Sequence, residues 1–327
     1  MKFAGIIAEY DPFHNGHAWQ LAQAKALGAE RVAVAMSCSL VQRGALPLLP
    51  EAVRTRSALT CGADLVFALP APCACAGAEA FARAGVALLA AAGCDGLVFG
   101  AETPDAALLM EAAELLDSAP YRAALKAQLA GGARSFAAAR QAAAAKLASD
   151  ERVAALLDKP NNNLAVEYCR AIRSLAPRME AYPLPRQGAN HGEALHSAHG
   201  QFASASALRK LWAEGGADAV APYVPEAVFP LYQEAYAAGQ YTDFSAAGRC
   251  ELALLRSACR GKAPFANIRG VSEGLEHRLE AAVRTSTTYD ELLDALTTVR
   301  YPRARMRRLA MDAALGYAAD SFPSLPP

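Results

Sequence analysis

Residues 9–17 read Glu9-Tyr10-Asp11-Pro12-Phe13-His14-Asn15-Gly16-His17 and join an apolar segment at 3–8 to a helical pattern at 18–27. The apolar segment is typical of a buried parallel strand. Backbone N–H groups at the start of the next helix point at anions, and Gly16 lets a phosphate approach the backbone closely. Imidazoles at 14 and 17 can donate to phosphate oxygens and stabilise charge as a phosphate bond breaks. The stretch therefore predicts a phosphate-binding strand–turn–helix, with an ordinary turn carrying two surface histidines as the alternative.

The alternation of strand and helix continues beyond this stretch. Further strands are predicted at 31–36, 64–69, 96–100 and 179–184, and helices at 51–60, at 77–92 and across most of 105–174. Strands and helices that alternate at this spacing form βαβ units. The sequence therefore predicts an α/β fold, with a Rossmann-like parallel sheet covered by helices on both faces.

The second half of the chain has a different pattern. A Gly-, His- and Ser-rich segment at 186–202 reads as a loop. Beyond it the predicted helices are 204–214, 225–238, 244–259, 271–285, 289–298 and 303–316. We therefore expect two regions, an α/β domain over residues 1–213 and a helical C-terminal region over residues 214–327.

Composition and charge narrow the classes of function. Apolar residues make up 54% of the chain, and 32 basic residues balance 32 acidic ones, so only a local patch can attract nucleic acid. No apolar run reaches the ~18 residues that a membrane span requires, and the N-terminus reads as a strand and not as a signal peptide. The eight cysteines contain no CxxC pair and read as buried, reduced thiols. We expect a cytoplasmic protein with no membrane contact.

A second phosphate-binding element is predicted at Ser204-Ala205-Ser206-Ala207-Leu208-Arg209. A serine before a helix caps its first turn and can also donate to a phosphate. Arg209 follows Ser206 by three residues on the same side of that turn, where a guanidinium can clamp a β- or γ-phosphate. A plain helix cap with a solvated arginine is the alternative.

These two elements together resemble the HIGH superfamily of nucleotidyltransferases, and more closely one bacterial family within it, the tRNA(Met) cytidine acetate ligases. The similar stretches follow one another along nearly the whole chain, at 9–17, 42–44, 97–102, 160–168, 204–209, 272–276 and 300–305. The resemblance implies an ATP-dependent enzyme that adenylates acetate. It also implies that the acetyl group then passes to the exocyclic amine of the wobble cytidine in elongator tRNA(Met).

The predicted site residues fall on these stretches. His14, His17 and Arg209 are the predicted catalytic residues, acting on phosphates. The resemblance implies that ATP contacts Ile7, Ala8, Glu9, Tyr10, Asp11, Pro12, Phe13, Asn15, Gly16, Gln20, Gly100, Asn161 or Asn162, and Arg186. Ser204 and Ser206 are added as phosphate contacts because of their place at the start of the second predicted helix. Asn161 and Asn162 compete for one aligned position, and Asp11 stands where the family usually has asparagine. Mg²⁺ is expected as the counter-ion of the nucleotide, held mainly by phosphates and water, and no protein metal site is predicted.

Two clusters lie outside the nucleotide motifs. The C-terminal arginines form a dense basic run, at Arg300, Arg303, Arg305, Arg307 and Arg308. Such a run predicts a surface for RNA phosphates, with a solvated basic helix as the alternative. Histidines gather in the predicted loop, at His191, His196 and His199, but no acid–cysteine set completes them as a metal site.

Two other functions also fit the sequence. One is another nucleotidyltransferase of the superfamily, which transfers an adenylyl or cytidylyl group to a small phosphorylated molecule. The other is a non-catalytic nucleotide- or RNA-binding protein that has degenerated from the enzyme. The intact His14, Gly16, His17 and Arg209 argue against the second of these.

Overall fold

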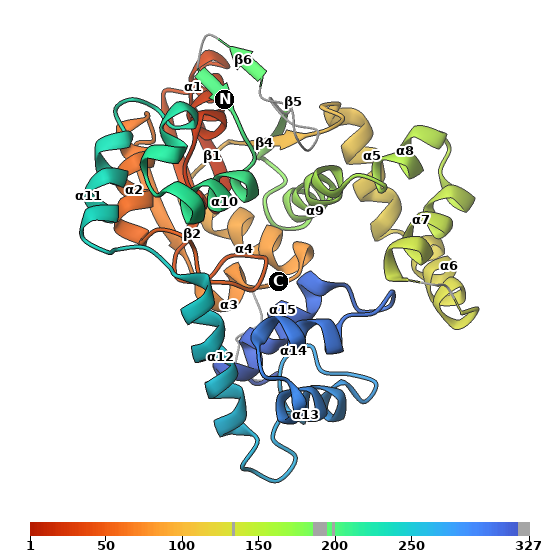
Figure 1. Ribbon diagram of the computed structural model, residues 1–327. Coiled ribbons are helices and arrows are strands. Elements are labelled where there is room, and N and C mark those ends of the chain that lie inside the picture. The colour runs from red at the N-terminus through yellow and green to blue at the C-terminus, as the bar shows by residue number, and fades with distance from the viewer. Residues whose placement is uncertain (133–134, 186–194, 198–199, 320–327) are drawn as a thin grey trace.

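A parallel β-sheet forms the centre of the molecule (Figure 1), and the computed structural model describes residues 1–132, 135–185, 195–197 and 200–319. The strands are β1 (Phe3–Ala8), β2 (Arg31–Ser37), β3 (Leu65–Leu69), β4 (Gly96–Ala101) and β5 (Glu180–Pro185). Their order in the sheet is β3-β2-β1-β4-β5, and neighbouring strands are parallel. The predicted α/β fold is confirmed. Because β2 and β4 lie on opposite sides of β1, the chain changes direction across the sheet between β1 and β4.

Helices cover both faces of the sheet (Figure 1). One face carries α1 (Asn15–Ala26) and α2 (Glu51–Thr60), and the other carries α4 (Ala78–Ala91) and α9 (Pro160–Leu175). Alternate residues of β2 supply the two cores: Val32 and Val34 pack with α1, whereas Ala33 and Ala35 pack with α4. Both faces are therefore buried, which explains why the strands read as continuous apolar runs. The short α3 (Ala71–Ala74) follows β3 and was missed by the sequence pattern.

A helical insertion separates β4 from α9. It consists of α5 (Ala106–Asp117), α6 (Ala119–Ala130), α7 (Phe136–Leu147) and α8 (Glu151–Leu156). The buried carboxylate of Glu167 on α9 attaches this insertion, because it accepts from Arg140 on α7 at 2.6 Å. Its other oxygen accepts from Arg170 of α9 at 2.7 Å, and Arg170 in turn donates to Asp117 of α5 at 2.7 Å. The helical prediction for 105–174 agrees with these elements.

The segment after β5 returns to the sheet domain. It contains a hairpin of β6 (Leu195–Ser197) and β7 (Gly200–Phe202), then α10 (Ala205–Gly215), the 3-10 helix η1 (Asp218–Tyr223) and α11 (Phe229–Ala237). The loop prediction for 186–202 was wrong at the hairpin, because strands of three residues rich in Gly, His and Ser show no apolar alternation. Trp212, Val220 and Tyr232 join the core beneath α1 and β2.

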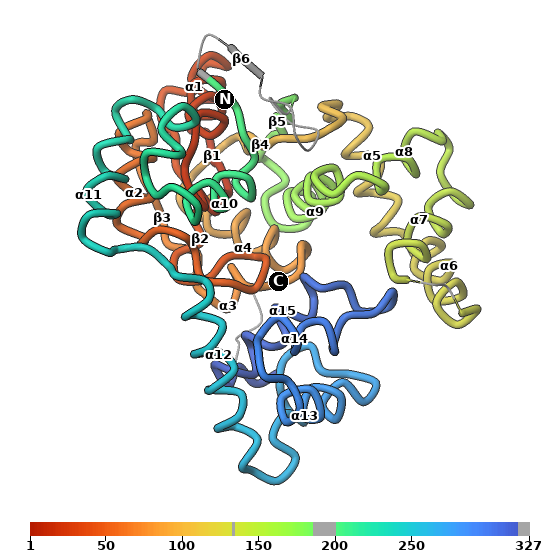
Figure 2. The backbone as a smooth tube through the Cα atoms, viewed as in Figure 1, coloured from red at the N-terminus to blue at the C-terminus, as the bar shows by residue number. Residues whose placement is uncertain are grey.

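Four further helices pack around a core of their own, which we call the helical body. They are α12 (Phe244–Ala258), α13 (Leu275–Thr285), α14 (Tyr289–Leu296) and α15 (Arg303–Ala314). Figure 2 shows that α12 leads away from the sheet domain and that α15 returns beside it. The change of core falls between Ala235 and Leu252, later than the expected boundary at residue 214. Within the described part of the chain, no helix has the length and apolar character needed to cross a membrane.

Candidate nucleotide-binding site

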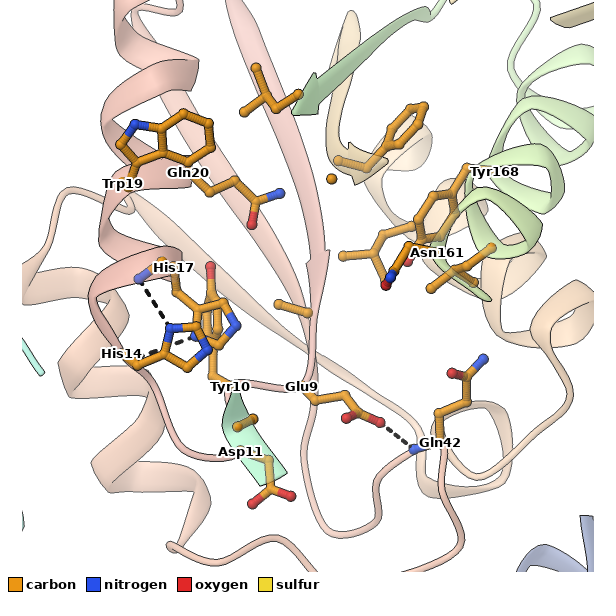
Figure 3. Close-up of a pocket in the computed structure, with 18 of the residues that line it drawn as sticks. Glu9, Tyr10, Asp11, His14, His17, Trp19, Gln20, Gln42, Asn161 and Tyr168 are labelled. Carbon is orange, nitrogen blue, oxygen red and sulfur yellow. Dashed lines mark hydrogen bonds between the residues drawn. The ribbon is translucent and has the colours of Figure 1, made fainter. Parts of the chain in front are cut away.

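A cavity of about 370 Å³ lies at the carboxyl ends of β1 and β4, where the chain changes direction across the sheet (Figure 3). Ligands of open α/β sheets bind at such a switch point. Among the predicted residues, the lining includes Ile7, Ala8, Glu9, Tyr10, Asp11, His14, Gly16, His17, Gln20, Gly100 and Asn161. The cavity thus brings together the end of β1, the start of α1, the end of β4 and the start of α9.

The two histidines form the first turn of α1. His14 is its N-cap, with an extended backbone, and its Nδ1 accepts from the N–H of Gly16 at 3.0 Å. The N–H of His14 in turn donates to Nδ1 of His17 at 3.3 Å, and the two rings stack with centroids 3.7 Å apart. Because each Nδ1 accepts, each neutral ring carries its proton on Nε2. Nε2 is therefore the donor atom of each neutral ring, and the cap explains why α1 begins three residues earlier than predicted.

Three residues of this stretch that were predicted to contact ATP do not line the cavity, namely Pro12, Phe13 and Asn15. They support the turn that carries the two histidines. Phe13 is fully buried, and its ring lies 5.6 Å from that of His17. Pro12 directly precedes it and is also buried. Asn15 is 4% exposed and donates to the backbone oxygens of Gln201 and Pro222 at 3.0 and 3.3 Å. These residues fix the position of His14 and His17 relative to the core.

A buried carboxylate lies between two arginines beside the histidines. The side chain of Asp11 is 1% exposed and accepts from Arg43 at 2.5 Å and from Arg209 at 3.2 Å. Its other oxygen accepts from the N–H of Leu48 at 2.6 Å. Burial lowers the pKa of Arg209 to about 10, although Asp11 opposes that shift. The predicted phosphate clamp is therefore already engaged in an ion pair.

Glu9 occupies the same end of the cavity and points towards Gln42 (Figure 3). Its carboxylate accepts from the N–H of Gln42 at 2.6 Å and lies 3.8 Å from the guanidinium of Arg43. Burial raises the pKa of Glu9, and the charge of Arg43 acts against this. Gln42 and Arg43 line the cavity, although the sequence identified them only as part of a family stretch.

Arg54 is a residue that the sequence analysis missed. It is fully buried on α2 and donates to the backbone oxygens of Leu49, Glu9, Ser37 and Cys38, the first three at 3.0, 2.7 and 2.6 Å. Burial lowers the pKa of Arg54. Its bonds join the ends of β1 and β2 behind Glu9. Arg56, two residues later, is exposed, and no local pattern distinguishes the two arginines.

The paired asparagines at the start of α9 have different surroundings. Asn161 lines the cavity, whereas Asn162 is fully buried and exchanges hydrogen bonds with Thr103 at 2.9 and 3.1 Å. The carboxylate of Glu102 accepts from the backbone N–H groups of both, at 3.2 and 2.7 Å, and thereby caps α9. Of the two, the geometry places Asn161 where it can contact a ligand.

The far end of the cavity is mainly apolar. Its lining includes residues that the sequence did not predict, namely Trp19, Phe81, Phe99, Leu164, Tyr168, Leu184 and Pro185. Gln20 points into this end (Figure 3), and its Nε2 donates to the backbone oxygen of Val98 at 3.2 Å. That bond leaves the amide oxygen of Gln20 as an acceptor. These residues come from five separate elements, so no single stretch of sequence could indicate them.

Comparison with known proteins assigns the sequence to a family. The profile of the HIGH nucleotidyl transferase family covers residues 1–326. A curated tRNA(Met) cytidine acetate ligase from Syntrophotalea carbinolica is 36% identical over 314 residues, which cover 95% of this chain and 73% of the relative. The chain belongs to the tRNA(Met) cytidine acetate ligase family. A second member, from Acetivibrio thermocellus, is 33% identical over 99% of this chain and 80% of its own length.

Solved structures of the family share the fold. Thermotoga maritima TmcAL bound with alpha-thio ATP superposes with a TM-score of 0.87 at 30% identity, and the match covers 97% of this chain and 76% of that one. The apo form of the same protein gives a TM-score of 0.89. Family membership and the nucleotidyltransferase fold are thus established for this chain.

The second motif of the family forms the start of α10. Ser204 is the N-cap, and its hydroxyl accepts from the N–H of Ala207 at 3.2 Å and lies 3.1 Å from the hydroxyl of Ser206. Ala205 lines the cavity, and Arg209 follows one turn later. Arg186, His191 and His199 lie outside the described residues, as does the side chain of His196. Within the described segments, no group of three or more His, Cys, Asp or Glu side chains is placed to hold a metal ion.

The C-terminal arginines do not form one open basic face. Arg300 pairs with Glu273 at 2.7 Å, and Arg303 pairs with Asp290 at 2.7 Å and with Asp294. Arg305 lies over the ring of Tyr301, at 5.0 Å, and Arg308 donates to the backbone oxygen of Gln42. Arg307 is half-buried on α15; within the described residues its guanidinium makes no ion pair at contact distance, but its charge acts on the carboxylate of Glu251 and opposes the rise of its pKa. Acids of α14 and of the turn before α13 therefore neutralise part of a run that contains only basic charges in the sequence.

Proposed function

We propose that this chain is an ATP-dependent ligase that activates acetate as acetyl-adenylate and acetylates the wobble cytidine of elongator tRNA(Met). The observation that carries the proposal is the cavity at the β1–β4 switch point, with the stacked His14 and His17 at its polar end, in a chain 36% identical to a curated ligase of that name. Because the proposed substrates are tRNA, ATP and acetate, we expect the reaction to take place in the cytoplasm.

In the first step a carboxylate oxygen of acetate attacks the α-phosphorus of ATP. The bond between that phosphorus and its bridging oxygen breaks, and pyrophosphate leaves with the electron pair. Acetate is ionised at neutral pH, so this step needs no general base. The Nε2–H groups of His14 and His17 stabilise the charge that develops on the phosphates, and Arg209 and Arg43 neutralise the departing pyrophosphate.

In the second step the exocyclic amine of cytidine attacks the acetyl carbon. The bond from that carbon to the AMP oxygen breaks, AMP leaves, and the amine loses a proton to solvent. The adenosine of ATP is expected at the apolar end of the cavity, near Gln20, Gly100 and Asn161. Mg²⁺ would accompany the nucleotide and be held mainly by phosphate and water oxygens, since the carboxylates of Glu9 and Asp11 are already paired with Arg43 and Arg209.

A product assay tests this function. The purified protein is incubated with ATP, labelled acetate and a tRNA(Met) transcript, and pyrophosphate and acetylcytidine are measured. Pyrophosphate should appear only with acetate, and acetylcytidine only with the transcript that carries cytidine at the wobble position. A transcript with uridine there is the matched control. Pyrophosphate release that requires a phosphorylated small molecule in place of acetate would assign the chain to another reaction of the superfamily.

A binding assay tests the nucleotide alone. ATP at ~100 times its dissociation constant should add about 2.7 kcal/mol to the free energy of unfolding. GTP should add much less, because the 6-oxo group of guanine cannot donate to the amide oxygen of Gln20. Equal shifts in thermal melts with the two nucleotides would contradict the assignment of this end to adenine.

A further inference from the structure

The loop at residues 41–45 separates the cavity from the helical body. It is closed by a hydrogen bond from the N–H of Val41 to the oxygen of Ala45, at 2.9 Å, and by one from the N–H of Gly44 to the oxygen of Val41, also at 2.9 Å. Gln42 and Arg43 of this loop line the cavity. Its other side faces α15, so one short segment contacts both regions.

On the α15 side the two backbones are in direct contact. Gly44 has a φ of +72°, and a Cβ placed there would lie 2.5 Å from the backbone nitrogen of Arg308 and 2.7 Å from the carbonyl carbon of Arg307. A side chain at residue 44 would therefore displace the helix. Arg308 also donates from Nη1 to the backbone oxygen of Gln42, at 3.1 Å. A small core of Leu40, Cys75 and Met311 fills the space beside this contact.

On the cavity side the same loop holds two carboxylates. The N–H of Gln42 donates to Glu9 at 2.6 Å, and the guanidinium of Arg43 donates to Asp11 at 2.5 Å. Asp11 is the partner of Arg209. A shift of the loop would therefore move Glu9, Asp11 and, through Asp11, the guanidinium of Arg209.

Arg308 contributes one specific contact to this arrangement. Burial lowers the pKa of its guanidinium, so the fold bears a cost for placing a cation here. Among the described residues its hydrogen bond goes to the Gln42 carbonyl, and not to a carboxylate. A hydrophobic residue would fill the space at less cost, which indicates that the bond to the loop is the useful property of this side chain.

We propose that Arg308 is a positioning residue for the nucleotide site: it holds the 41–45 loop in the register that places Arg43 and, through Asp11, Arg209 for ATP. The helical body is thereby part of the ATP site, although α15 is not among the elements that line the cavity. The proposal deepens the proposed function and rests on ATP being the ligand of the cavity.

Three variants test the proposal. Arg308→Met removes the donor and keeps an apolar stem, and Arg308→Lys keeps a cationic donor. Arg269→Met is the control for attachment of the helical body, because Arg269 pairs with Asp312 of α15 at 2.6 Å and donates to the backbone oxygens of Pro72 and Cys75 at 2.5 and 2.7 Å, which joins the helical body to the segment after β3. ATP affinity is measured by calorimetry, and melting temperatures are measured in parallel.

Arg308→Met should weaken ATP binding about tenfold or more, since a small misplacement of binding groups has effects of that size. Arg308→Lys should recover most of the affinity. Arg269→Met should lower the melting temperature and leave ATP affinity unchanged. If the methionine variant does not fold, Arg308→Gln, whose shorter side chain also loses the contact, replaces it with the same expectation.

Two results would overturn the proposal. One is an Arg308→Met protein that binds ATP like the wild type. The other is an equal loss of affinity in Arg269→Met, which would mean that general docking of the helical body matters and the 41–45 loop does not. Because ATP affinity is measured without acetate or tRNA, a wild-type protein that binds ATP and fails to acetylate tRNA contradicts the proposed function alone.

Discussion

Arg209 donates from one nitrogen to both the backbone oxygen and the carboxylate of Asp11, at 2.5 and 3.2 Å, across a separation of 198 residues. The carboxylate is almost fully buried and also accepts from Arg43. A phosphate that binds these guanidinium groups must share them with this anion. The ion pair therefore positions Arg209 beside the first turn of α1 and, at the same time, competes with the nucleotide.

Asp11→Asn should strengthen ATP binding severalfold. The amide oxygen can keep the bond from Leu48, whereas the charge that competes with phosphate is lost. The free energy of unfolding should fall by roughly 1–3 kcal/mol, because buried donors lose a charged partner. Calorimetry with ATP and a thermal melt measure the two effects. Asp64→Asn, which removes a surface ion pair with Lys25, is the control and should not change ATP affinity. If Asp11→Asn binds ATP more weakly than the wild type, the carboxylate of Asp11 supports nucleotide binding and does not compete with it.

His17 combines a capping role with the proposed chemical role, and two substitutions separate them. His17→Ala loses both, so stability should fall by about 1 kcal/mol and acetate-dependent pyrophosphate release ~100-fold. His17→Gln keeps an acceptor for the N–H of His14, as in other capping boxes, and should recover stability without recovering rate. If the rate of His17→Gln stays within about threefold of the wild-type rate, the imidazole serves only as a helix cap, because the loss of a donor to the phosphates should lower the rate far more.

Glu251 should make stability depend on pH. It is 8% exposed and accepts from the hydroxyl of Tyr289 at 2.5 Å, and burial raises its pKa to about 7. The pKa of Glu251 in the folded protein lies above its usual value of 4.5. Between these two values the folded protein therefore binds a proton that the unfolded chain has released. This proton stabilises the fold, and its contribution to the free energy of unfolding is lost as the pH rises from 4.5 through about 7.

Glu251→Gln imitates the protonated form and should remove this loss. The variant should exceed the wild type by roughly 1–3 kcal/mol at pH 8, and the difference should shrink towards pH 5. Denaturant titrations across this range give the measurement. Glu234→Gln, at an exposed position, should show no such trend. A difference that stays constant with pH would mean that Glu251 is ionised throughout.

The C-terminal arginines should contribute unequally to tRNA binding. Arg303→Gln should leave the salt dependence of tRNA affinity unchanged, because Asp290 and Asp294 already neutralise that charge. Arg307→Gln should reduce the slope of log affinity against log salt by about one, as expected for one lost phosphate contact. Filter binding at several salt concentrations measures both. Equal slopes for Arg307→Gln and the wild type would place the RNA surface elsewhere.

Local patterns were sufficient for the five strands of the sheet and for helices such as α2, but not for α3 or the β6–β7 hairpin. The helix predicted at 51–60 is α2 at Glu51–Thr60, and the strand predicted at 31–36 is β2 with one residue added. Periodicity and turn residues decide such elements within a few neighbours. The phosphate-binding turn could be predicted for the same reason, because His14, Gly16 and His17 are adjacent and form their own cap.

The tertiary structure decided which distant segments contact one another. The sequence determined the α/β fold, the His14–His17 turn and the family. It did not determine that Arg54 is buried while Arg56 is exposed, that Asn161 and not Asn162 lines the cavity, or that acids of α14 neutralise Arg303. The physical reason is that burial and ion pairing depend on which surfaces meet after folding, and a chain pattern records only the periodicity of each element by itself.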